Sequence, residues 1–102
     1  MDLPSVLIPA YKPDDKMLKL IEDLLELGFS RIMVVNDGSG SDYDACFARA
    51  ETLGCRIVRH AVNMGKGRAL KTGLNEAMLC GFSEPGVITA DADGQHLPGD
   101  IR

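Results

Sequence analysis

Residues 5–36 read SVLIPAYKPDDKMLKLIEDLLELGFSRIMVVN. The stretch opens with an apolar run at 5–10, which is typical of a strand buried on both faces. An acidic helix start at 13–15, apolar residues at helical spacing and a stop at Gly28 follow. A second apolar run occupies 31–36. This order of strand, helix and strand predicts a βαβ unit, and such a unit implies a parallel sheet.

The next residues repeat the alternation of helix and strand. Residues 41–53 have helical spacing, and Ser41 with Asp44 resembles a capping box at the helix start. Residues 55–60 alternate more strongly between apolar and polar side chains, so we expect this strand to lie nearer an edge of the sheet.

A third helix and a fourth strand complete the pattern. Gly73 lies on the apolar stripe of this helix and predicts a close approach of helix and sheet. The apolar run at 87–90 predicts the last strand. The sequence therefore predicts an α/β fold, a Rossmann-like βαβαβαβ parallel sheet with right-handed crossovers, as one domain over residues 1–102. The apolar stripe predicted for the third helix consists of Leu70, Leu74, Ala77 and Met78.

Composition narrows the classes of function. The 102 residues carry a net charge of -4, which argues against a nucleic-acid surface, because such a surface needs a basic stripe. The three cysteines form no CxxC pair, which disfavours zinc and redox sites. No apolar run reaches the roughly 18 residues of a membrane helix, and no signal peptide is recognisable. We expect a cytoplasmic protein, which in full length could act at the cytoplasmic face of a membrane.

Polar and aromatic side chains follow each predicted strand. Tyr11, Asp37, the loop at Asn63 and Asp91 come directly after the four apolar runs. Because ligands of doubly wound sheets bind beyond the carboxyl ends of the strands, we expect these groups to gather at one edge. Neither a G-x-G-x-x-G fingerprint nor a P-loop is present.

Asp91, Asp93 and Gln95 form the sharpest motif. Two carboxylates and an amide oxygen at successive i+2 positions suit a hard cation, and Mg²⁺ or Mn²⁺ would complete its coordination with substrate phosphates. An isolated Asp-x-Asp is more often a solvated turn, but here it follows three other polar loops at the same edge. An EF-hand is excluded because His96 and Arg102 occupy the positions that require Gly and Glu.

Several side chains of the middle loops suit a nucleotide. The Asp37 carboxylate could accept hydrogen bonds from a nucleobase imide or amine, or could merely start a turn at Gly38. Asn63, Lys66 and Arg68 offer an amide and two cations to a nucleotide or a diphosphate. His60 we interpret as a residue at the end of a strand.

Four motifs in order resemble family-2 glycosyltransferases of the type-A fold. They are VLIPAY at 6–11, VVNDGS at 34–39, NMGKGRAL at 63–70 and ADADGQH at 90–96. The Asp-Ala-Asp-Gly-Gln-His form is most similar to the dolichyl-phosphate mannose synthase branch. The resemblance implies an inverting, metal-dependent transferase that takes a sugar from a nucleotide diphosphate to a polyprenyl phosphate or a glycan.

The same resemblance implies roles for individual positions. The metal ligands would be Asp91, Asp93 and Gln95, and the metal would act as a Lewis acid on the leaving diphosphate. The donor-binding residues would be Pro9, Ala10, Tyr11, Val35, Asp37, Lys66, Ala90, Asp91 and Ala92.

Two departures qualify the resemblance. Pro13 stands where some relatives carry an acidic residue, and the family's catalytic base lies downstream of Arg102. We therefore expect the chain to be the donor-binding half of the domain, to be inactive alone, and to self-associate through an exposed sheet edge. The alternatives are a non-catalytic nucleotide-sugar-binding module and, less favoured without a Gly-rich first loop, a sugar nucleotidyltransferase.

Overall fold

The computed structural model describes residues 3–82 and 86–92. Strands and helices alternate along the chain as the sequence predicts. The elements in order are β1 (Ser5–Ala10), α1 (Asp15–Glu26), β2 (Ile32–Asp37), the 3₁₀ turn η1 (Ser41–Tyr43), α2 (Asp44–Thr52), β3 (Arg56–His60), α3 (Lys66–Leu79) and β4 (Val87–Thr89).

The strands form one parallel sheet in the order β3-β2-β1-β4. The chain moves outward from β1 to β3 and then returns to the other side of β1 with β4. This return makes the carboxyl end of β1 a point where the strand order reverses, and such points bind ligands in doubly wound folds. The predicted α/β fold is confirmed, and so is the position of β3 at an edge.

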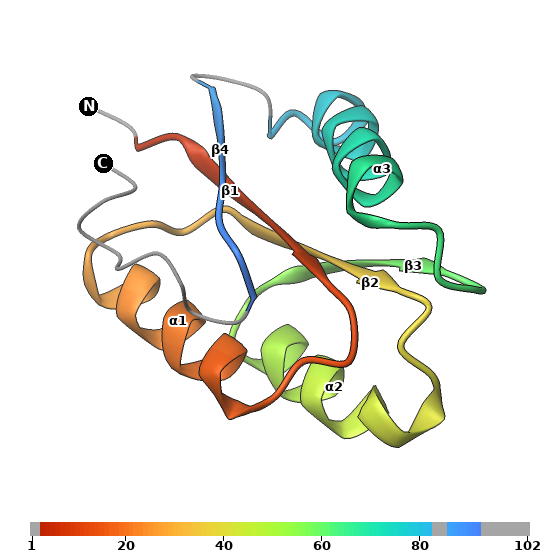
Figure 1. The fold of residues 1–102 in the computed structure, drawn as a ribbon. Coiled ribbons are helices and arrows are strands. Elements are labelled where there is room, and N and C mark those ends of the chain that lie inside the picture. Colours follow the sequence, from red (N-terminus) through yellow and green to blue (C-terminus); the bar gives the residue numbers. More distant parts are fainter. Residues whose placement is uncertain (1–2, 83–85, 93–102) are drawn as a thin grey trace.

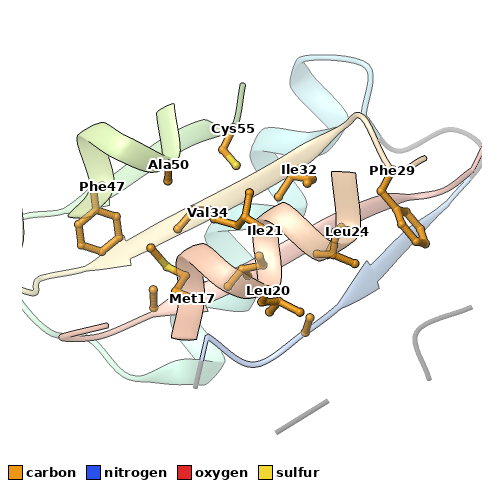
Figure 2. Close-up of a cluster of buried hydrophobic side chains, with 14 residues drawn as sticks. Met17, Leu20, Ile21, Leu24, Phe29, Ile32, Val34, Phe47, Ala50 and Cys55 are labelled. Carbon is orange, nitrogen blue, oxygen red and sulfur yellow. The ribbon is translucent and has the colours of Figure 1, made fainter. Parts of the chain in front are cut away.

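Helices cover both faces of the sheet, with α1 and α2 on one side and α3 on the other (Figure 1). The larger core lies under α1 and α2, where Met17, Ile21 and Leu24 of α1 pack against Val34 of β2 and Phe47 of α2 (Figure 2). The helical spacing predicted for α1 is therefore the spacing of its buried residues.

The start of α2 differs from the predicted capping box. Residues Ser41–Tyr43 form the 3₁₀ turn, α2 begins only at Asp44, and no side chain caps either N-terminus. The prediction placed Ser41 directly before an α-helix, whereas the left-handed Gly40 turns the chain into a short 3₁₀ segment first.

The buried stripe of α3 also differs from the prediction. Ala69, Gly73 and Ala77 face the sheet, whereas Leu74 and Met78 are 44% and 71% exposed. The reason is close packing, because a Cβ placed on Gly73 would lie 2.3 Å from the nearest methyl carbon of Leu7. Small residues let the helix backbone approach the sheet, and the larger apolar side chains are turned to its flank.

Two strands have a free edge among the described residues, since β3 pairs only with β2 and β4 only with β1. No helix in the described ranges is long and apolar enough to cross a membrane.

Candidate functional site

A pocket of about 390 Å³ opens at the carboxyl end of the sheet. It lies beside the point where β4 returns next to β1, as expected for a doubly wound sheet. The volume is within the range of small-molecule sites. The lining residues are Pro9, Ala10, Tyr11, Asp37, Asn63, Lys66, Ala69, Asp91 and Ala92.

Most residues predicted to bind the donor line this pocket, but two do not. Val35 is completely buried among the residues that pack under α3, and Ala90 is buried in the core beneath α1. Their side chains are therefore buried in the core and do not line the pocket. The structure does not describe Asp93 and Gln95, so two of the three predicted metal ligands lie outside it.

Asp37 ends β2 and is only 3% exposed. Its Oδ1 accepts a hydrogen bond from the backbone N–H of Met64 at 2.9 Å and contacts His60 Nδ1 at 2.8 Å. Its Oδ2 accepts from the backbone N–H of Gly65 at 3.0 Å and from Asn63 Nδ2 at 3.1 Å. One buried carboxylate thus holds the whole loop that leads into α3.

His60 links this carboxylate to α3. A carboxylate can only accept here, so His60 Nδ1 carries the proton, and Nε2 lies 2.8 Å from Thr72 Oγ1. Burial raises the pKa of Asp37, but hydrogen bonds from His60, Met64 and Gly65 outweigh it, and the pKa falls below its ordinary value. The sequence placed His60 at a strand end but gave no signal for its pairing with Thr72, because that contact depends on how α3 packs.

The loops after β1, β2 and β3 are joined further by short-range contacts. Asn36 Oδ1 accepts from the N–H of Ser39, and Ser39 Oγ accepts from the N–H of Lys12. Gly38 has a φ of +68°, and a Cβ there would lie 2.2 Å from the backbone nitrogen of Asn63. The pocket wall is therefore a set of interlocked loops, and glycine is required at position 38.

Charge at the pocket mouth comes from Lys66 and Asp91. Lys66 Nζ lies 2.7 Å from Asp91 Oδ1, and the lysine side chain is 63% exposed while that of Asp91 is 23% exposed. Among residues 3–82 and 86–92, no group of three or more His, Cys, Asp or Glu side chains could hold a metal ion. Asp91 supplies a carboxylate of the kind that Mg²⁺ and Mn²⁺ prefer, and the other predicted ligands follow it in the sequence.

Comparison with known proteins settles the family. The pattern of the family described as "Glycosyl transferase family 2" matches residues 5–102, which is almost the entire chain. The chain belongs to glycosyl transferase family 2. In this family-2 chain, residues from all four motifs that carried the resemblance line the pocket.

Similar curated proteins come from methanogenic archaea. An uncharacterized protein of Methanocaldococcus jannaschii is 38% identical over 95% of this chain and 38% of its own length. A UDP-N-acetylglucosamine–dolichyl-phosphate N-acetylglucosaminyltransferase of Methanococcus voltae is 28% identical over 94% of the chain and 43% of its own length. No solved structure matches the chain significantly. The family-2 chain thus spans about two fifths of the length of these relatives.

Proposed function

We propose that this chain is the donor-binding part of a family-2 glycosyltransferase, and that its pocket holds a nucleotide-diphosphate sugar. The intact enzyme transfers the sugar to a polyprenyl phosphate or a glycan acceptor. The observation that carries the proposal is the pocket itself, where side chains from all four family motifs meet. Family membership also favours sugar transfer over nucleotidyl transfer.

The nucleoside occupies the end of the pocket between β1 and β2. Tyr11 is 49% exposed there and offers an aromatic face to the base, with Pro9 beside it. Asp37 lies at the same wall, and we assign recognition of the base edge to its carboxylate. We assign base recognition to this end because the opposite end carries the charges that a diphosphate needs.

The diphosphate occupies the end of the pocket near Lys66 and Asp91. Lys66 is the cation at this end and can turn from Asp91 toward phosphate oxygens, since its side chain is largely exposed. Asp91, Asp93 and Gln95 would hold Mg²⁺ or Mn²⁺, which supplies charge stabilisation to the departing nucleoside diphosphate when bound.

The acceptor class rests on one relative. The Methanococcus voltae protein is named for transfer of N-acetylglucosamine to dolichyl phosphate. The Asp-Ala-Asp-Gly-Gln-His motif at 91–96 supports the same class of acceptor here, because it is the form that resembles the dolichyl-phosphate branch.

Calorimetric titration of the chain with UDP and GDP, each with and without Mn²⁺, tests donor binding. We expect one of them to bind in a metal-dependent way, and Asp91→Ala to abolish the metal dependence. Lys66→Met should weaken nucleotide binding about tenfold, because it removes a cation next to the diphosphate. Asp42→Ala removes an exposed carboxylate away from the pocket and serves as the matched control. A folded chain that binds neither nucleotide would overturn the proposal.

A further inference from the structure

The Asp37 carboxylate has no acceptor position left for a ligand. A carboxylate has about four lone-pair sites. In Asp37 they meet the N–H groups of Met64 and Gly65, the imidazole of His60 and the side-chain amide of Asn63. If this carboxylate reads the base of the nucleotide, one of these four groups must leave first.

The four groups differ in how easily they can leave. The N–H groups of Met64 and Gly65 belong to a loop that Gly38 contacts closely at Asn63, so moving them would shift the backbone. His60 is 8% exposed and is held from its other side by Thr72. Asn63 is exposed, and its side chain borders the pocket. Its Nδ2 makes the longest contacts with Asp37, at 3.1 Å to Oδ2 and 3.3 Å to the backbone carbonyl oxygen. Asn63 is therefore the group that can leave at the lowest cost.

The chemistry of Asn63 matches that of a base edge. Its Nδ2 must face Asp37, because the side-chain oxygen would set two acceptors against each other. A carboxamide places an N–H next to a C=O. Uracil presents the same pair at N3 and O4, and guanine presents it at N1 and O6. Cytosine and adenine place a ring acceptor where these bases carry the N–H, and that acceptor would be repelled by the carboxylate.

The geometry points to an exchange at Asp37: in the free protein the Asn63 carboxamide occupies the base subsite, and the N–H of a uracil or guanine replaces it. This inference rests on the proposed function and names the residue that gives way in that same site. Asn63 swings toward solvent while His60, Met64 and Gly65 keep the carboxylate charged and in place. The exchange keeps the buried carboxylate fully paired in both states, which avoids the cost of an unpaired buried acceptor.

Removing the side chain of Asn63 gives a test with a defined sign. Asn63→Ala frees an acceptor position of Asp37 in advance. We therefore expect the variant to bind the better-bound of UDP and GDP at least as tightly as the wild type does, and up to about tenfold more tightly. CDP should bind at least about tenfold more weakly than this better-bound nucleotide to both proteins. Asn75→Ala changes an exposed asparagine on α3 and should leave every affinity unchanged.

A spectroscopic measurement on the wild type does not depend on how the variant folds. When the nucleotide binds, the chemical shifts of the Asn63 side-chain amide protons should move toward those of a solvent-exposed asparagine, and these protons should exchange faster with water. The shifts and exchange rates of the Asn75 side-chain amide should not change. Three results would each overturn the exchange alone. They are weaker binding by Asn63→Ala, an Asn63 amide that stays protected in the complex, and equal affinity for CDP and for the better-bound of UDP and GDP. Absence of nucleotide binding by the wild type would overturn the proposed function and the exchange with it.

Discussion

His60 Nδ1 donates a hydrogen bond to Asp37 Oδ1 over 2.8 Å, and the two side chains are 8% and 4% exposed. The contact joins the ends of two neighbouring strands, β2 and β3, at the wall of the pocket. Thr72 continues the connection into α3. The same network that holds the fold together at this edge thus sets the position of the proposed base-reading carboxylate.

Replacing Asp37 by Asn should destabilise the chain by about 1–3 kcal/mol, because an amide cannot accept from all the donors that the carboxylate satisfies. The loss is read from the midpoint and slope of urea unfolding at pH 7. Asp42→Asn, which changes an exposed carboxylate, should unfold at the wild-type urea concentration.

The same variant tests the pH dependence of stability. The pKa of Asp37 is lowered in the folded chain, so its contribution is present above the unfolded pKa of about 3.9 and is lost as pH falls through the folded pKa. Asp37→Asn should therefore lose less stability than the wild type between about pH 5 and pH 2. An equal fall in the free energy of unfolding of the two proteins between about pH 5 and pH 2 would show that Asp37 does not cause this pH dependence.

Gly38→Ala should be among the most costly single substitutions in the chain. Its Cβ would overlap the backbone of Val62 and Asn63, and its φ of +68° is unfavourable for alanine. We expect a loss of about 2–5 kcal/mol. Gly54→Ala separates the two causes, since Gly54 has a φ of +105° but open space around its Cβ position, and should lose only about 1–2 kcal/mol. Equal losses in urea unfolding would mean that the close approach is unimportant.

Two glycines of α3 form a second matched pair. Gly73→Ala overlaps Leu7 and should cost about 1–3 kcal/mol. Gly67→Ala meets nothing within 4 Å and should be neutral or stabilise the chain by up to ~1 kcal/mol through helix propensity. Thermal unfolding of both variants compares them directly, and a stabilising Gly73→Ala would show that α3 does not lie tightly on β1.

Within residues 3–82 and 86–92, β3 and β4 each have one unpaired edge. These edges predict self-association of the chain, because an unpaired strand edge is a template for another strand. Sedimentation velocity over a range of concentrations measures it. We expect the weight-average sedimentation coefficient to rise with concentration, and one sharp monomer peak at all concentrations would contradict the prediction.

Local patterns predicted most of the fold because each was set by residues near in sequence. The buried strand 5–10, the acidic start of α1 and the glycine stop after it needed no long-range information. For the stripe of α3, the sequence correctly placed Ala77 and Gly73 against the sheet, but spacing alone could not show that Leu74 and Met78 are turned away from it. That choice was made by Leu7, a residue far away in the sequence that leaves room for nothing larger than glycine.

The gathering of the pocket side chains at one edge was predictable for a related reason. The rule that parallel strands gather their carboxyl ends at one edge placed Tyr11, Asp37, Lys66 and Asp91 around one pocket. It could not predict that Asn63 and His60 would occupy acceptor positions of the Asp37 carboxylate, since those contacts depend on the path of a loop. Side-chain partners inside a site are set by tertiary packing rather than by local pattern.

The most direct test of donor binding at this edge is a backbone amide NMR titration of the chain with UDP and GDP in the presence of Mg²⁺. We expect one nucleotide to shift the amide resonances of residues 10–11, 37–39, 63–66 and 91–92 together, with a single dissociation constant. The amide resonances of α1 and α2 should not shift. Shifts confined to another part of the chain, or no shifts with either nucleotide, would contradict the account.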